Sequence, residues 1–141
     1  MKRLQRILAI SVLFGSLYAF IEIMLIEGLY KQRIDVANIW DLYHTVMFLL
    51  FVFVFFSLQY VLHMKFTIRT FMLSLAFAMI ALVVEDIAYM ITMGYDIKTA
   101  GWEGEPIQGF FLGWFLGVPI WMLVYIIVAY LIIKYRRKIP G

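Results

Sequence analysis

The sequence predicts an all-α membrane protein in which four transmembrane helices form an antiparallel bundle. Of its 141 residues, 65% are hydrophobic and only 15% are charged, whereas a soluble domain carries about a quarter charged residues. This composition excludes a water-soluble globular domain, a disordered chain and a protein that binds nucleic acid. The chain has no cysteine, which excludes disulfides and thiolate metal sites.

Four stretches are apolar over the roughly 20 residues that a helix needs to cross the hydrocarbon core of a bilayer. They cover about residues 7–29, 42–63, 71–93 and 109–133. Only short ends and loops remain outside them, so we expect a single transmembrane domain over residues 1–141. The first stretch is too long for the apolar part of a signal peptide and contains Glu22, so we expect it to remain as a helix.

The basic residues predict which ends of these helices face the cytoplasm. Nine of the twelve lie before the first stretch, between the second and third, or after the fourth. The other two loops hold the remaining three, accompanied by acidic residues. We therefore expect both termini in the cytoplasm, and a multi-pass protein of the cell membrane whose main partner is the lipid bilayer.

The first three stretches each place polar residues along one helix face, which suits the inside of a bundle. On the first stretch this face comprises Ser11, Gly15, Tyr18, Ala19 and Glu22. On the second it comprises Asp41, His44, Thr45, Phe48, Val52, Phe55, Gln59 and His63. On the third it comprises Ser74, Ala78, Ala81, Glu85, Ala88 and Tyr89.

The fourth stretch differs, because it opens with glycines and contains a proline. Gly109, Gly113 and Gly117 repeat every four residues, a spacing that allows a close helix contact inside the bundle or in a homo-oligomer. Pro119 follows them, and we expect the helix to bend there.

Two acidic residues inside the spans are the strongest indication of function. Glu22 and Glu85 each lie seven or eight residues before the outer end of their stretch, which puts both roughly 12 Å below the outer surface. No Lys or Arg lies within any span to neutralise them. A charge at the bilayer centre costs about 2.5–3.5 kcal/mol on insertion scales. The two carboxyls are therefore expected to share protons or to hold a cation between them, and they are our candidates for catalysis.

One hypothesis is a metal site in the outer half of the bundle. Asp41 and His44 lie one helical turn apart, and Glu22, Glu85 and Asp86 would complete a shell of oxygen and nitrogen ligands. Such a shell suits a divalent metal such as Zn, Mn or Fe. Helical bundles do hold metals with carboxylates and histidines, although this chain lacks the paired Glu-x-x-His motifs of the di-metal proteins.

The two histidines can also be explained without a metal site. His44 could be an interfacial residue that forms a hydrogen bond with Asp41 and holds no metal. Haem is not expected, because His44 and His63 are the only histidines and lie near opposite ends of one predicted helix.

A second hypothesis is that the chain is a proton- or cation-coupled transporter or channel subunit. The aromatic residues Tyr18, Tyr89, Trp114 and Trp121 could surround Glu22 and bind an organic cation through their ring faces. This arrangement is similar to that of small multidrug-resistance transporters, which also have four helices and a functional glutamate in the first. The present chain is longer, and its Glu85–Asp86 pair has no counterpart in that family.

Two further hypotheses remain open. The segment VVEDIAYMI, residues 83–91, resembles the acidic and aromatic stretch of membrane-bound carotenoid cyclases, which implies an enzyme acting on a lipid or isoprenoid with Glu85 or Glu22 as proton donor. Alternatively, the chain is a structural subunit of a membrane complex, and its buried acids pair with Tyr, Thr and backbone groups. The sequence favours metal or cation binding and leaves open whether the binding serves catalysis or transport.

Overall fold

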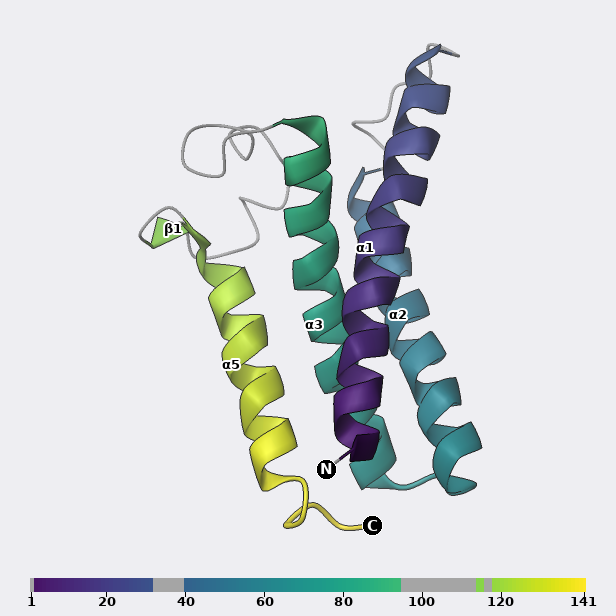
Figure 1. Cartoon of the computed structure of the whole chain (residues 1–141), viewed down its shortest axis with the longest axis vertical. Helices are drawn as coiled ribbons and strands as arrows, with labels where there is room; N and C mark the ends of the chain where they lie inside the picture. Colours follow the sequence, from purple (N-terminus) through teal and green to yellow (C-terminus); the bar gives the residue numbers. More distant parts are fainter. Residues whose placement is uncertain (1, 32–39, 95–113, 116–117) are drawn as a thin grey trace.

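A computed structural model describes residues 2–31, 40–94, 114–115 and 118–141. Its helices are α1 (Lys2–Lys31), α2 (Trp40–His63), α3 (Ile68–Met93) and α5 (Ile120–Tyr135). They run alternately in opposite directions, and both chain termini lie at one end of the molecule, called the termini end below (Figure 1). The opposite end, where α3 stops before Gly94, is called the Gly94 end. The predicted helices over 7–29, 42–63 and 71–93 are confirmed, each extended by a few residues.

The fourth helix begins later than the sequence predicts. Within the expected helix over 109–133, residues 114–115 form β1 (Trp114–Phe115) and residues 118–119 form β2 (Val118–Pro119), paired antiparallel, and α5 begins at Ile120. The helix prediction is therefore wrong for those four residues. Proline lacks an N–H and disrupts a helix interior, but it is well tolerated at a helix start. Gly109, Gly113 and Gly117 lie outside the described residues, so their close helix contact stays a prediction.

The ends of α3 are defined by specific caps. At its start the Thr67 hydroxyl accepts a hydrogen bond from the Thr70 N–H at 3.1 Å, and the Thr67 N–H donates to the Thr70 hydroxyl at 2.9 Å. This reciprocal capping box satisfies two of the groups that a helix start leaves unpaired. At its end Gly94 adopts a left-handed conformation with φ of 70°, which glycine accepts without steric cost.

Helix α3 is the centre of the bundle, because it packs against α1, α2 and α5. Its small residues Ala76, Ala78 and Ala81 are fully buried. Helices α1 and α2 also meet each other, mainly through aromatic rings: the Phe14 ring lies 4.9 Å from that of Phe51, centroid to centroid, edge to face. Edge-to-face pairs of this kind add about 0.5–1.5 kcal/mol beyond their buried area.

The backbones of α1 and α3 approach each other closely at Gly15. A Cβ atom added there would overlap the carbonyl oxygen of Ala81 and would lie 3.2 Å from the Glu85 nitrogen. Only a residue without a side chain fits this position, as is typical of helix contacts that rely on small residues. Gly15 therefore fixes the distance and the register between α1 and α3.

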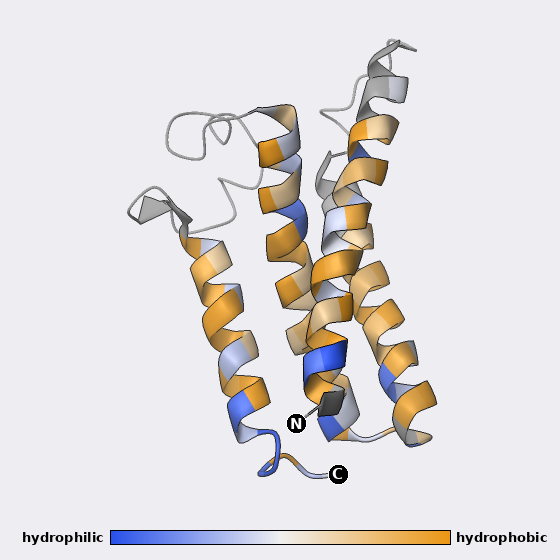
Figure 2. Cartoon of the chain, viewed as in Figure 1, coloured by the Kyte–Doolittle hydropathy of each residue, from blue (hydrophilic) through white to orange (hydrophobic). Residues whose placement is uncertain are grey.

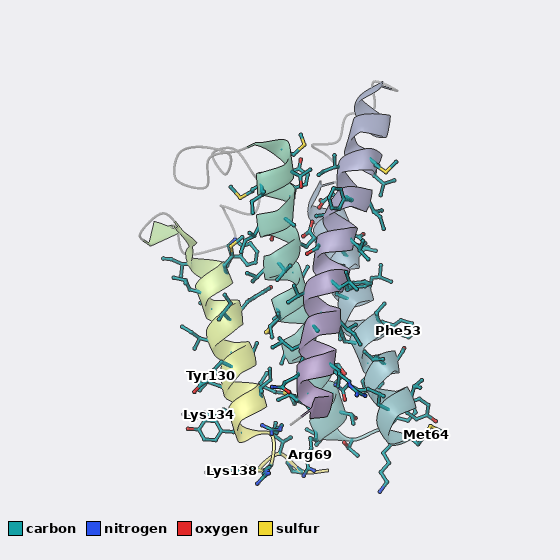
Figure 3. The ribbon with its side chains drawn as sticks, in the orientation of Figure 1. Phe53, Met64, Arg69, Tyr130, Lys134 and Lys138 are labelled. Carbon is teal, nitrogen blue, oxygen red and sulfur yellow. The ribbon has the colours of Figure 1, made fainter. Side chains whose placement is uncertain are left out.

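The outside of the helices is strongly apolar along their length (Figure 2). Leu13, Leu17, Phe53 and Ile127 are more than half exposed, and Phe53 points away from the bundle in Figure 3. Within the described chain, α1 over Leu4–Leu25 and α3 over Ile68–Met93 are long and apolar enough to cross a membrane. The apolar stretches Val46–Leu62 and Ile120–Tyr135 are shorter.

The termini end carries basic side chains and a bound tail (Figure 3). The Arg69 guanidinium donates two hydrogen bonds to the Ile139 carbonyl, at 2.8 and 3.0 Å, and the Arg69 N–H donates to the Pro140 carbonyl at 3.1 Å. Lys134 lies 5.5 Å from the centroid of the Tyr130 ring, within the range of a cation–π contact. These hydrogen bonds hold the segment after α5 against the start of α3.

The substitution Gly15→Ala tests the contact between α1 and α3. We expect it to lower the free energy of unfolding in mixed detergent micelles by about 1–3 kcal/mol, because the new methyl group overlaps the Ala81 backbone. The matched control is Gly28→Ala on the same helix, where an added Cβ meets nothing within 4 Å. The control should be neutral or stabilising by up to about 1 kcal/mol, through helix propensity. Equal effects of the two changes would contradict the close contact.

Candidate functional site

The seam between α1 and α3 contains the two acidic residues that the sequence singles out. On α1, Gly15, Ala19 and Glu22 follow one another on one face and are all buried. On α3, the corresponding face carries Ala81 and Glu85, again buried. Because the backbones touch at Gly15, the longer side chains beyond it are directed into the same narrow space between the two helices.

Glu22 and Glu85 are both withdrawn from solvent and interact with each other. Glu22 is 4% exposed and Glu85 is 0% exposed. The Glu85 carboxyl interacts with the side chain of Glu22 and with the charge of Asp86. The structure thus brings Glu22 and Glu85 together, and Asp86 follows Glu85 directly along α3.

The surroundings of Glu85 supply no compensating group in the described parts of the chain. Neither carboxyl oxygen has a partner there at hydrogen-bonding distance and angle. The nearest basic residues along the two helices are Arg6 and Lys31 on α1 and Arg69 on α3, all several turns away. A buried carboxylate without a partner is strongly disfavoured, so the pair must hold a proton or accept a cation.

Aromatic rings from α1, α2 and α5 pack within the bundle, and one of them, Tyr125, interacts with Asp86. Tyr18 is half-buried on α1 and lies 4.9 Å from Phe51 on α2, centroid to centroid. On α5, Trp121 is buried and its ring lies 5.3 Å from that of Tyr125, centroid to centroid. Tyr125 interacts electrostatically with Asp86. Tyr18 and Trp121 therefore come from opposite sides of α3, and Tyr125 packs against the buried clusters on both sides.

The sequence prediction omits Tyr125, which interacts with Asp86, and Phe51, a fully buried ring on α2. Tyr125 follows the predicted Trp121 by four residues, so the helix repeat alone could have added it. Phe51 likewise precedes Phe55 by four residues on the buried face of α2, whereas the prediction chose Phe48 and Val52, which are only partly buried.

Three of the remaining predicted site residues have side chains outside the described residues. Asp41 and His44 lie in the first turns of α2 and Trp114 lies in β1, but their side chains are outside the described residues. Tyr89 is half-buried on α3. Among the side chains that are described, no group of three or more His, Cys, Asp or Glu is arranged to hold a metal ion.

A substitution at Glu85 separates a functional carboxyl from a structural one. We expect Glu85→Met, which keeps an unbranched side chain of similar size, to raise the free energy of unfolding in mixed micelles by roughly 1–3 kcal/mol, because it removes a buried group without a hydrogen-bond partner. The control Leu82→Met changes a buried residue one turn earlier and should cost less than about 1.5 kcal/mol. A marked loss of stability in Glu85→Met alone would show that the carboxyl has a structural role.

No protein-family model, no curated protein and no solved structure matches the chain.

Proposed function

We propose that the chain is a multi-pass membrane protein of the cell membrane that binds a cation at the Glu22–Glu85 carboxyl pair. Its membrane location is supported by the length and apolar character of α1 and α3 and by the large apolar side chains exposed around the bundle. Because α2 and α5 pack along α3, we place them in the same membrane as α3. The basic residues at the termini end favour a cytoplasmic location for that end.

The observation that carries the proposal is the burial of two interacting carboxyls with no Lys or Arg within seven residues of either one along its helix. In a medium of low dielectric constant a carboxylate attracts a cation far more strongly than it does in water. Glu22 and Glu85 therefore favour two states, one in which protons neutralise the pair and one in which a cation replaces them. Exchange between these states would couple cation binding to proton release.

The chemistry of the ligands indicates which cations fit. Glu22, Glu85 and Asp86 offer only carboxylate oxygens, which suit hard and borderline cations. A divalent transition metal such as Zn, Mn or Fe would require further ligands, and Asp41 and His44 in the first turns of α2 are the candidates. An organic cation would instead use the ring faces of Tyr18, Tyr125 and Trp121.

Carbodiimide labelling of the purified protein in detergent tests the carboxyl pair. Dicyclohexylcarbodiimide is apolar and reacts with protonated carboxyls in an apolar environment, so we expect it to modify Glu22 or Glu85, as located by peptide mass spectrometry. The cation that binds should block this reaction and raise the melting temperature of the wild type. Zn, Mn, Na and tetraphenylphosphonium ions are the probes, with metal content measured in parallel.

Three variants complete the test. Glu22→Gln and Glu85→Gln should each abolish the stabilisation by the cation, whereas Ser16→Ala should retain it. Ser16 lies on α1 beside the seam and donates to the Val12 carbonyl of its own helix. The proposal is wrong if the carboxyls do not react and no probe stabilises the wild type more than the two glutamine variants.

A further inference from the structure

The Glu22–Glu85 pair lies much closer to one end of the bundle than to the other. Along α3, Glu85 is about 12 Å from the last residue, Met93, but about 25 Å from the first residue, Ile68, at 1.5 Å per residue. The four residues from Ile91 to Gly94 are all exposed. Just before them, Met90 is still buried and packs against Trp121 and Met122 of α5, so the described cover of α3 on that side ends within two turns of Glu85.

On the termini side of the pair, aromatic side chains fill the bundle. We call Phe14, Phe51, Phe55 and Phe77 the aromatic layer. Phe51, Phe55 and Phe77 are fully buried. The Phe14 ring contacts Phe51 at 4.9 Å and Phe55 at 5.6 Å, and Phe55 lies 6.3 Å from Phe77. The layer therefore spans all three helices α1, α2 and α3.

The seam between α1 and α3 is also closed at this level. The Gly15 backbone lies directly against Ala81, with no room for even a methyl group between them. A hydrated ion cannot pass where two backbones are in contact. The aromatic layer and this contact together block the direct path from the carboxyl pair toward the termini end.

Beyond the aromatic layer the bundle becomes polar again. Gln59 follows Phe55 by one turn on the same face of α2, and both polar atoms of its buried amide lack partners among the residues that the structure describes. Ser11 and Ser74 are fully buried on α1 and α3, and each donates to its own helix, which leaves its oxygen free to accept. The aromatic layer thus separates two buried polar regions.

We propose that the cation enters and leaves the Glu22–Glu85 pair only from the Gly94 end, and that the aromatic layer isolates the pair from Gln59 and from the termini end. This inference rests on the proposed function, because it assumes that a cation binds the pair. The side from which reagents reach the pair, however, can be measured without any cation.

Cysteine accessibility tests the inference, and the chain suits it because it contains no native cysteine. Ala19→Cys places a thiol on the seam beside the pair, and Ser11→Cys places one beyond the aromatic layer. Exposed positions near each end, Thr92→Cys and Lys138→Cys, report which face of a sealed vesicle a reagent has reached. The reagent is a membrane-impermeant cationic methanethiosulfonate, added to either face of vesicles that contain the full chain.

We expect Ala19→Cys to react only from the face that also labels Thr92→Cys, and Ser11→Cys not to react from that face. Adding Phe51→Ala should make Ser11→Cys react from that face at least about tenfold faster, because it opens the aromatic layer. If Ala19→Cys does not fold, Ala88→Cys at a half-buried position on α3 replaces it.

Reaction of Ala19→Cys or Ala88→Cys from the face that labels Lys138→Cys overturns the inference, as does failure of either thiol to react from the Thr92 face. Failure of cation binding would give a different pattern. In that case no probe cation would raise the melting temperature of the wild type above that of the glutamine variants, while the one-sided thiol reactivity would persist.

Discussion

The contact of α1 with α3 at Gly15 is the constraint on which the arrangement of the polar residues depends. Two helices in an apolar solvent gain nothing from hiding apolar surface, so close packing must hold them together. Because the backbones touch at Gly15, Glu22 and Glu85 are forced into one space with no room for an intervening apolar side chain. A bulkier residue at Gly15 would separate the helices and leave each carboxyl to find its own surroundings.

The buried carboxyls lower the stability of the fold, and the packing of the rest of the bundle must compensate for that loss of free energy. The core around them consists of aromatic rings and small residues that are almost entirely withdrawn from solvent. Such a core would be at least as stable with an apolar residue in place of Glu85. Retention of an unfavourable group in a stable framework is typical of functional sites, where activity and stability make opposing demands. Ionisable residues inside a membrane are likewise costly in free energy and typically functional.

Much of the fold follows from the sequence, because apolar length and the helix repeat are local properties. They predicted three helices to within a few residues, and the spacing of Gly15, Ala19 and Glu22 predicted which face of α1 is buried. The start of α5 could not be predicted in this way. Whether Pro119 bends a helix or precedes it depends on what surrounds it, and apolar residues such as Trp114 and Phe115 suit a strand equally well.

The candidate site could be predicted from the sequence only in part. Glu22, Glu85 and Asp86 stand out in the sequence because acids are rare in apolar stretches. The aromatic neighbours were harder to find, since nearly every position around them is apolar. Neighbouring residues on a helix differ by about 100° in direction, so choosing Val52 instead of Phe51 places the wrong side chain in the core. Only the packing of α2 against α1 and α3 settles that choice.

In the membrane location proposed above, the hydrogen bonds from Arg69 to the tail would affect the surrounding lipid. Helix α5 has 16 residues and so reaches only about 24 Å, less than the roughly 30 Å of an average hydrocarbon core. Since Arg69 ties its end to the start of α3, the shortfall must fall at the opposite end, around β1 and β2. Hydrophobic mismatch on one side of a protein thins the bilayer locally, so the leaflet beside β1 and β2 should be drawn inward.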